Sequence, residues 1–361
     1  MNGPFAAGLP LPAGLRARFL DNGNGLRVHL LEAGDRTRPC LLLLHGFPEL
    51  AYSWRKVIPA LAAAGFYVVA PDQRGYGRTT GWDPAYDGEV DSFRLLNLVR
   101  DTRGVLAALG RRSVAAVVGH DFGASVAACC ALLHPDQFRS LVLMSAPFGG
   151  PPTRDIGEEL AALPRPRKHY QWYYSTRQAN DDMWHCAQGV HAFLRAYFHY
   201  KSGDWAGNRP FRLARWSAAE LAKMPPYYIM DRDKTMAETV APEMPDAKTI
   251  AACRWLPEDE LAVYSSEYAR TGFLGGLQWY RCRTEERNND LGVAGRTIDV
   301  PSTFIAGASD WGIHQVPGAL EGMQKSTCTR MRACHLLEGA GHWVQQEKAD
   351  DVARLILESL S

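Results

Sequence analysis

The sequence lacks an excess of either charge and has no long apolar run free of polar groups. Its 361 residues carry 40 Lys and Arg against 39 Asp and Glu, and no long block of like charge occurs. We therefore expect no nucleic-acid partner, because such surfaces need a basic stripe that displaces counterions. The most apolar stretch, residues 114–133, holds His120 and Asp121 at its middle. We interpret it as strand, turn and helix, not as a membrane span.

Cysteine pairs at metal-binding or redox spacing are also absent. The eight cysteines show no C-x-x-C motif, so the sequence suggests neither a structural zinc site nor a disulfide framework. The N-terminus lacks the basic segment of a signal peptide and is broken by Gly and Pro. We therefore expect reduced thiols, a cytoplasmic location, and no metal or other cofactor.

Strands alternate with helices at both ends of the chain. Apolar and β-branched runs predict strands at residues 26–31, 40–44, 66–70, 114–118, 141–144, 302–306 and 332–337. Helical patterns predict helices at residues 54–64, 91–109, 124–133 and 349–360. This alternation predicts an α/β fold with a mostly parallel sheet flanked by helices.

Residues 149–296 differ in character from the two ends. They hold ten of the fourteen Tyr and six of the ten Trp, and prolines punctuate their start. We expect an inserted, mostly helical cap at 149–296, and a core formed by residues 1–148 and 297–361. Residues 201–245 make this cap longer than a minimal one, and they shape either the pocket entrance or an oligomer contact. A homodimer is one possibility.

The sharpest motif is GHDFGA at residues 119–124, between a predicted buried strand and a helix. Small residues two positions before and after Asp121 allow a tight turn that presents its side chain over the sheet, as in the nucleophile elbow of α/β hydrolases. The alternative is that Asp121 caps the following helix, since Asp is a favoured N-cap residue.

Two further residues complete a catalytic triad in the chain order of that fold. Asp310 follows a late strand, and His342 lies in a loop after the last strand. The order of nucleophile, acid and base is that of α/β hydrolases, with the acid orienting the imidazole. The loop at residues 145–148 contains no carboxylate, which favours Asp310 as the acid.

The segment HGFP at residues 45–48 follows an early buried strand, where the fold supplies half of its oxyanion hole. We expect the backbone N–H groups of Phe47 and Phe122 to be the two donors. The Phe47–Pro48 bond is a candidate cis peptide, because cis bonds are nearly confined to proline.

Together these motifs resemble the epoxide-hydrolase branch of the α/β-hydrolase superfamily over nearly the whole chain. The segment PDQRGYG at residues 71–77 is similar to a family loop that we take as structural. The resemblance implies that two cap tyrosines, Tyr170 and Tyr280, hold the oxirane oxygen. Tyr173, Tyr174, Tyr227 and Tyr228 compete with Tyr170 for this role. The predicted substrate contacts are His45, Pro48, Gln171 and Trp343.

A carboxylate nucleophile is suited to displacement at a saturated carbon, because it is already anionic at neutral pH. The expected reaction is hydrolysis of an apolar epoxide by water, with an alkyl ester of Asp121 as the intermediate and His342 as the base. A dehalogenase is the alternative enzyme, although Phe122 stands where those enzymes usually carry Trp or Arg. A non-catalytic ligand-binding protein is the third reading. A serine esterase is disfavoured because Ser125 lies inside the predicted helix.

Overall fold

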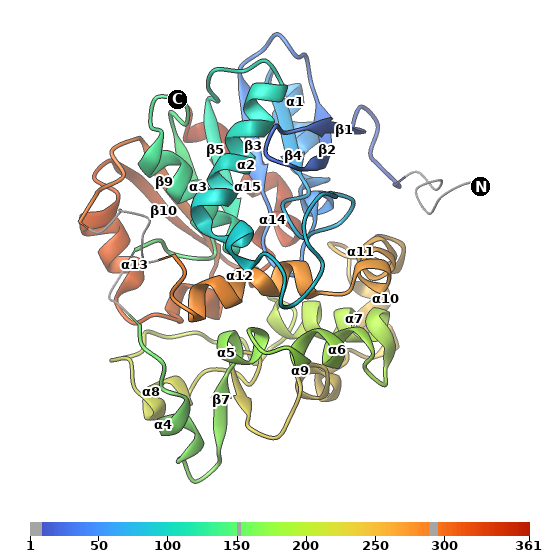
Figure 1. The fold of residues 1–361 in the computed structure, drawn as a ribbon, viewed down its shortest axis with the longest axis vertical. Helices are drawn as coiled ribbons and strands as arrows, with labels where there is room; N and C mark the ends of the chain where they lie inside the picture. Colours follow the sequence, from blue (N-terminus) through green and yellow to red (C-terminus); the bar gives the residue numbers. More distant parts are fainter. Residues whose placement is uncertain (1–8, 150–152, 289–294) are drawn as a thin grey trace.

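The computed structural model describes residues 9–149, 153–288 and 295–361, and its centre is an eight-stranded sheet (Figure 1). The strand order is β1-β2-β4-β3-β5-β6-β9-β10. The pairs β1–β2 and β2–β4 are antiparallel, and every later pair in this order is parallel. The strands are β1 (Arg16–Asp21), β2 (Arg27–Ala33), β3 (Cys40–Leu44), β4 (Tyr67–Pro71), β5 (Ala116–His120), β6 (Leu141–Met144), β9 (Ser302–Gly307) and β10 (Met331–Leu337).

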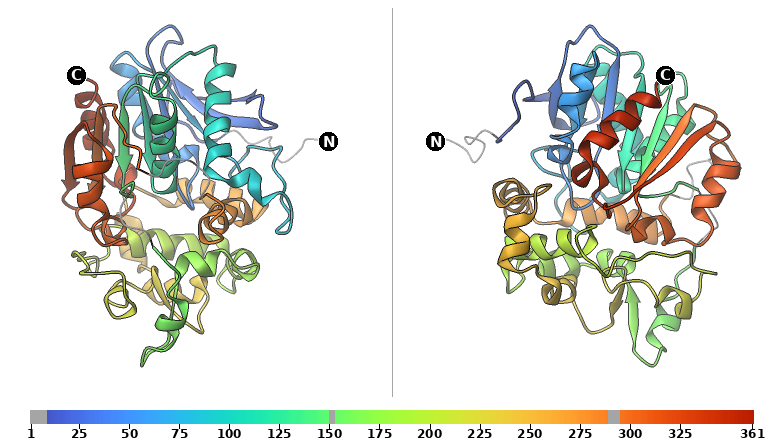
Figure 2. Two further views of the ribbon diagram at one scale, coloured as in Figure 1. Left: turned by 60° about the vertical axis from the view of Figure 1, so that its left-hand side comes forward. Right: turned by 180° about the vertical axis from the view of Figure 1, so that it is seen from behind.

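Helices cover both faces of this sheet, as Figure 2 shows. The helices α2 and α3 pack together on one face, while α1 and α15 pack on the other. The central strands β3, β4, β5 and β6 are buried along their whole length, as expected for parallel strands covered on both sides. The core helices are α1 (Ile58–Ala63), α2 (Leu95–Ala108), α3 (Phe122–Leu133), α13 (Ala319–Gly322), α14 (Val344–Glu347) and α15 (Ala349–Glu358).

Single-turn helices connect several of these elements. They are the 3-10 helices η1 (Ala51–Trp54), η2 (Val90–Phe93) and η4 (Trp311–His314), and the π-helix η5 (Met323–Thr327). The predicted helix at 91–109 is wrong as one element, because Arg94 adopts an extended conformation and separates η2 from α2. The predicted helix at 54–64 likewise divides into η1 and α1, and Pro59 lies in the first turn of α1.

A second, mostly helical layer lies beyond the carboxyl ends of the parallel strands (Figure 1). Besides its helices, this layer contains a two-stranded antiparallel sheet of β7 (Arg167–His169) and β8 (Ile229–Asp231), which the sequence analysis did not predict. Its helices are α4 (Gly157–Ala161), α5 (Tyr170–Tyr174), α6 (Gln178–Trp184), α7 (Gly189–Lys201), α8 (Ala218–Leu221), α9 (Met236–Val240), η3 (Ala241–Glu243), α10 (Ala247–Ala252), α11 (Glu258–Thr271) and α12 (Leu274–Thr284).

The segment 201–245 is part of the packing of this second layer. The strand β8 belongs to this segment and pairs with β7, and the backbone N–H of Tyr170 donates to the carbonyl of Tyr228 at 2.9 Å. The extra segment thus fixes the start of α5. The expected boundaries of the inserted layer lie beside residues 150–152 and 289–294, which are outside the described residues.

The helix α12 rests directly on the core loop at residues 71–77. A Cβ atom on Gly275 would lie 2.0 Å from the carbonyl oxygen of Gly75, so the two backbones touch. The indole Nε1 of Trp279 donates to the carbonyl of Arg74 at 3.0 Å, and its ring meets Tyr76 edge-on. The loop therefore has the structural role that the sequence suggests, which is to hold α12 over the sheet.

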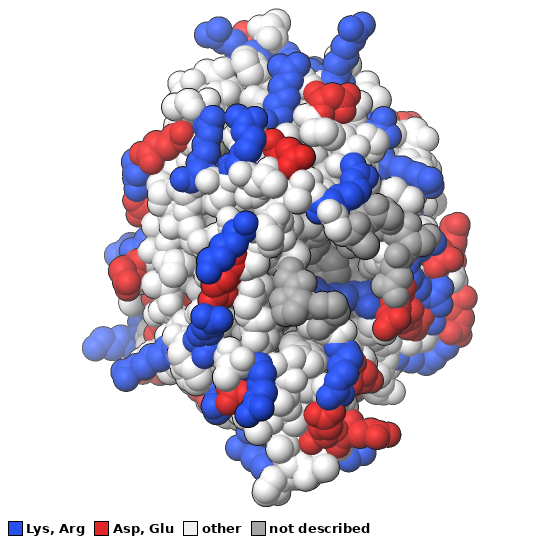
Figure 3. Space-filling model, turned by 90° about the vertical axis from the view of Figure 1, so that its left-hand side faces the viewer, with Lys and Arg blue, Asp and Glu red and all other residues white. Residues whose placement is uncertain are grey.

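Charges of both signs are interspersed on the face shown in Figure 3. Within the described residues, no helix is long and apolar enough to cross a membrane. All eight cysteines are free thiols.

Candidate active site

Asp121 occupies the sharp turn between β5 and α3. Its backbone lies at φ 52° and ψ −120°, a region that non-glycine residues rarely adopt. The alternative in which Asp121 caps α3 is wrong, because its side chain forms no capping hydrogen bond. Such strain persists where the surrounding structure enforces it, often at functional sites.

Two glycines make this turn possible. A Cβ atom on Gly119 would lie 2.2 Å from the carbonyl oxygen of Gly123. A Cβ atom on Gly123 would lie 2.4 Å from the carbonyl oxygen of Leu44 in β3. The start of α3 is therefore pressed against the sheet, and the Asp121 side chain projects above the strand ends.

The structure brings the three triad residues together. The Nδ1 atom of His342 lies 3.1 and 3.2 Å from the two carboxylate oxygens of Asp310. On the other side of the ring, Nε2 lies 3.4 Å from Oδ2 of Asp121, an ion-pair distance without hydrogen-bond geometry. The side chains of His342 and Asp310 are 1% exposed, whereas that of Asp121 is 13% exposed. Of the three, Asp121 is the residue that a ligand in the pocket can reach.

The charges of the triad shift its pKa values in the directions that nucleophilic catalysis needs. Burial opposes ionisation of Asp121, but the close contact and charge of His342, with the charge of Lys201, hold its pKa well below the usual 3.8. Burial and Lys201 lower the pKa of His342, and Asp310 and Asp121 more than compensate and raise it above 6.5. Asp121 is therefore anionic at neutral pH.

One carboxylate oxygen of Asp121 already contacts a predicted oxyanion donor. The backbone N–H of Phe47 donates to Oδ1 at 3.0 Å. The following Phe47–Pro48 bond is cis, which confirms the prediction for this bond. Phe122, the other predicted donor, is the first residue of α3 and lines the pocket over Asp121.

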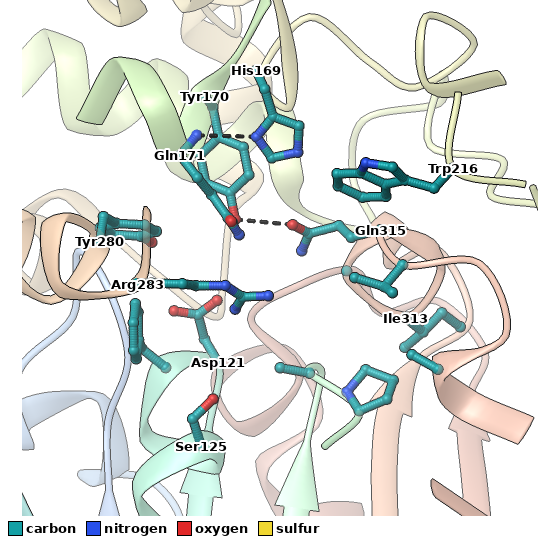
Figure 4. A pocket seen from close by; sticks show the side chains of 16 residues that line it. Asp121, Ser125, His169, Tyr170, Gln171, Trp216, Tyr280, Arg283, Ile313 and Gln315 are labelled. Atoms are coloured by element: carbon teal, nitrogen blue, oxygen red, sulfur yellow. Dashed lines mark hydrogen bonds between the residues drawn. The ribbon is translucent and has the colours of Figure 1, made fainter. Parts of the chain in front are cut away.

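A pocket of about 630 Å³, including the part open to solvent, lies between the nucleophile and the helical layer (Figure 4). Asp121, Tyr170 and Tyr280 all line it, so the structure unites the nucleophile with both predicted tyrosines. The ring centroids of Tyr170 and Tyr280 are 5.9 Å apart. None of the competing tyrosines at positions 173, 174, 227 and 228 is among the lining residues.

The two tyrosine hydroxyls differ in their partners. The Tyr170 hydroxyl donates to Oε1 of Gln315 at 2.9 Å and accepts from Nε2 of Gln171 at 3.1 Å. The Tyr280 hydroxyl has no hydrogen-bond partner among the described residues. Burial, and then the charge of Asp121, raise the pKa of both phenols well above 10, so both keep their protons at neutral pH.

Of the four predicted substrate contacts, only Gln171 lines this pocket. His45, Pro48 and Trp343 are buried outside its lining. The Nε2 atom of His45 accepts from the backbone N–H of Gln73 at 3.1 Å. The indole of Trp343 donates to the carbonyl of Phe198 at 2.8 Å. His45 and Trp343 therefore stabilise the backbone around the site and do not contact a ligand in this pocket.

Glu49, which the sequence analysis missed, joins the loop after β3 to the segment after β10 that carries His342. Glu49 contacts Nδ1 of His120 at 2.5 Å and accepts from the side-chain amides of Gln345 and Gln346 at 2.8 and 3.0 Å. The Nε2 atom of His120 lies 2.7 Å from the carbonyl oxygen of His342. Glu49 lies one residue beyond the HGFP segment and His120 lies within the GHDFGA motif, but only the folded contacts show the roles of these two side chains.

A buried lysine was also missed. Lys201, the last residue of α7, places its ammonium 4.9 Å from the ring centroid of Tyr228 and 5.4 Å from that of Trp343. Burial lowers its pKa to about 8, although the charges of Asp121 and Asp310 act in the opposite direction. Lys201 thus adds positive charge beside the two triad carboxylates.

Glu347 fixes the loop that carries His342. Its carboxylate accepts backbone N–H bonds from Gly341 at 3.0 Å, Trp343 at 3.0 Å and Gly203 at 2.7 Å. The neighbouring N–H of His342 donates to the carbonyl of Lys201 at 2.9 Å. The base loop and the segment after α7 are therefore tied to each other on both sides of His342.

Burial raises the pKa of Glu347 to about 7, although the three N–H donors oppose this shift. The folded state therefore holds a proton on Glu347 more tightly than the unfolded chain. The contribution of this group to stability decreases as the pH rises from about 4.5 toward 7.

Substitution Glu347→Gln should destabilise the protein and loosen the base loop. A glutamine offers one acceptor oxygen to three N–H groups, and each buried N–H left without a partner costs about 1–3 kcal/mol. We expect a lower melting temperature and faster hydrogen exchange of the amides at residues 341–343. Glu358→Gln, at an exposed residue of α15 paired with Arg354, is the matched control. An unchanged melting temperature in Glu347→Gln would contradict the role of this clamp.

Among the described residues, no group of three or more His, Cys, Asp or Glu side chains is arranged to hold a metal ion.

Comparisons with known proteins agree with this geometry. Residues 39–349 match the alpha/beta hydrolase fold family. The chain is 33% identical to epoxide hydrolase A of Mycobacterium tuberculosis, over 95% of this chain and 97% of that protein. It is 30% identical to an epoxide hydrolase of Caballeronia sordidicola, over 93% of this chain and 91% of the relative.

Solved structures give the same relationship. An epoxide hydrolase from an endophytic Streptomyces superposes with a TM-score of 0.80 at 34% identity, over 97% of this chain and 96% of that chain. Potato (Solanum tuberosum) epoxide hydrolase I superposes with a TM-score of 0.75 at 29% identity, over 95% and 98% of the two chains. With an aspartate on the nucleophile turn and two tyrosines opposite it, the chain belongs to the epoxide hydrolases of the α/β-hydrolase fold family.

Proposed function

We propose that the protein converts an epoxide and water into a vicinal diol through a covalent alkyl ester of Asp121. The observation that carries this proposal is that the two carboxylate oxygens of Asp121 have different partners. Oδ1 accepts the N–H of Phe47, whereas Oδ2 lies on the side of His342. Oδ2 is therefore the attacking atom, and Oδ1 becomes the ester carbonyl oxygen.

In the first step, Oδ2 attacks one epoxide carbon and the bond from that carbon to the ring oxygen breaks. The departing oxygen takes a proton from a tyrosine hydroxyl, leaving a tyrosinate and the hydroxyalkyl ester. Tyr280 is the better placed donor, because its hydroxyl has no competing partner among the described residues. Tyr170 has to give up its bond to Gln315 before it can donate.

In the second step, His342 removes a proton from water, and the hydroxide attacks the Asp121 carbonyl carbon. Negative charge develops on Oδ1, where the N–H of Phe47 already lies and where that of Phe122 is expected to assist. The diol oxygen leaves and takes its proton from the imidazolium. The regenerated Asp121 carboxyl group gives its proton back to the tyrosinate, so the cycle closes with one water consumed.

The pKa of His342 responds to the charge on Asp121, and this helps His342 to act as the base in ester hydrolysis. In the free enzyme the anionic Asp121 contributes to raising the pKa of His342. Esterification removes that charge, while Lys201 remains and lowers the same pKa. The imidazole therefore becomes more easily neutral at the stage at which a neutral base is needed.

The alternative functions find less support in the pocket. A dehalogenase is disfavoured because Tyr170 and Tyr280, two phenols that keep their protons, line the pocket and suit a departing alkoxide, which needs a proton that a halide ion does not. A serine esterase would need its nucleophile on the turn, but Ser125 lies within α3. A non-catalytic role is disfavoured by a complete triad with hydrogen-bond and ion-pair distances.

We further propose that residues 149–296 form a cap that carries Tyr170 and Tyr280, and that residues 1–148 and 297–361 form the core that carries the triad. A cytoplasmic location is supported by the eight free thiols. The homodimer stays a prediction.

The variant His342→Gln should accumulate the ester. Ring opening needs Asp121 and a tyrosine, whereas ester hydrolysis needs the base, so the intermediate has no efficient way to break down. Intact-protein mass spectrometry with styrene oxide should show one adduct of the substrate's mass. The double variant His342→Gln with Asp121→Asn is the control and should show none. An adduct of equal yield on the double variant would place the alkylation elsewhere.

Substitution Tyr280→Phe should slow ring opening more than Tyr170→Phe does. Loss of a general acid typically costs 10²–10⁴-fold in rate, and we expect roughly 10²-fold or more for Tyr280. The measurement is the single-turnover rate of ester formation, compared with the rate of ester breakdown. Tyr174→Phe is a matched control, since this ring packs on Tyr280 at 5.1 Å but does not line the pocket. Equal slowing of both steps by Tyr280→Phe would indicate a packing role.

A further inference from the structure

The wall of the pocket contains a cation that the proposed mechanism does not use. Arg283 lines the pocket together with Asp121 and Tyr170. It follows Tyr280 by three residues on α12, so the two side chains share a face of this helix. Figure 4 shows the Arg283 side chain extending from α12 across the pocket, close to the nucleophile in this view.

Arg283 differs from its neighbouring arginines in its contacts with the described residues. Arg281 pairs with Glu285 at 2.6 Å, and Arg287 pairs with Asp91 at 2.8 Å and with Glu285 at 2.7 Å. The guanidinium of Arg283 forms no hydrogen bond or ion pair within the described residues. An arginine can donate five N–H bonds, so this side chain offers a vacant set of donors to a ligand.

The largest contributions that lower the pKa of Asp121 come from His342, Lys201 and His120. The charge of Arg283 acts on two other side chains that line the pocket, His169 and Tyr170. Together with burial it lowers the pKa of His169 to about 3, and it opposes the rise in the pKa of Tyr170. His169 is therefore neutral, and Arg283 is the one cationic side chain among the described lining residues.

The rest of the lining restricts the ligand to a compact molecule with one polar end. Apolar groups form much of the wall opposite α12, namely those of Ala146, Pro147, Ile313, Val316 and Ala319. Residues at i and i+3 of a helix have Cβ atoms about 5–6 Å apart. Since both side chains leave neighbouring positions of α12 and line one pocket with Asp121, a compact ligand can reach Arg283 with its polar end while Tyr280 holds its oxirane oxygen.

We propose that Arg283 binds a carboxylate on the substrate, and that the preferred substrates are compact epoxy acids with the carboxylate a few bonds from the ring. The proposal rests on the epoxide-hydrolase function stated above. A guanidinium matches a carboxylate in a two-pronged geometry. A single guanidinium balances the one charge of a carboxylate, whereas a phosphate dianion would leave excess negative charge beside Asp121.

The test compares acids with their neutral amides across three spacer lengths, using the terminal epoxides of vinylacetic, allylacetic and undecylenic acids. The variants are Arg283→Gln and Arg283→Lys. Arg112→Gln removes the same charge at an exposed residue between α2 and β5 and serves as the control. The measured quantity is the ratio of kcat/KM for the acid to that for the amide.

For the two short acids, Arg283→Gln should lower this ratio roughly tenfold or more, mainly through KM, because a charged hydrogen-bonded pair is lost. Arg283→Lys should restore part of the ratio, Arg112→Gln should leave it unchanged, and the undecylenic pair should depend little on Arg283. An equal loss for acids and amides in Arg283→Gln would overturn the proposal, since Arg283 would then only support α12.

Hydrolysis of styrene oxide, which carries no acid, separates this inference from the proposed function. Suppose that the wild-type protein hydrolyses styrene oxide, and that the acid-to-amide ratio of kcat/KM is the same in wild type and in Arg283→Gln. The carboxylate site is then wrong, and the epoxide-hydrolase function stands. If styrene oxide is not hydrolysed, binding of butyrate and of butyramide, measured by calorimetry, tests Arg283 without turnover. The site is supported if Arg283→Gln loses binding of butyrate but not of butyramide. It is overturned if wild type and Arg283→Gln bind butyrate equally.

Discussion

The structure depends on keeping one negative charge at Asp121 on a buried, strained turn. A buried carboxylate is costly unless nearby groups compensate for its lost hydration. Here Oδ1 accepts the N–H of Phe47, His342 lies beside Oδ2, and the charge of Lys201 adds to the compensation. These groups come from the loop after β3, the loop after β10 and the end of α7. The stability of the anion therefore requires that three distant parts of the chain meet above one strand end.

Several contacts hold these parts together without touching a ligand. Glu49 joins the first loop to α14, and Glu347 joins the base loop to the backbone at Gly203. The loop at residues 71–77 receives α12, and with it Tyr280 and Arg283, through the contact of Gly75 with Gly275. A catalytic geometry that must be accurate to a fraction of an ångström thus has a rigid support on each side.

Much of the fold and the triad could be predicted from the sequence, because both depend on local patterns. Strands buried on both faces read as continuous apolar runs, and β3 and β6 begin and end where the sequence places them. The edge strand β1 was not predicted, since its half-exposed residues lack such a run. The pair β7–β8 joins segments some sixty residues apart, a pairing that no local pattern reveals.

The residues around the triad were less predictable, because their roles arise from contacts distant in sequence. Glu49, Lys201 and Glu347 act on the site through partners in other elements, and nothing in their immediate neighbours indicates this. His45 and Trp343 adjoin motif residues and were predicted to contact the substrate, but they do not line the pocket. Arg283 could have been found from its spacing to Tyr280 on one helix face.

The most direct measurement of the central claim is a single turnover in heavy-oxygen water with enzyme in excess of substrate. The covalent mechanism predicts that the label enters the side chain of Asp121, and that the first diol released carries none, because its new oxygen comes from the carboxylate. Mass spectrometry of the peptide containing Asp121 and of the diol gives both values. A labelled first diol with an unlabelled Asp121 would contradict the account, since water would then have attacked the epoxide directly.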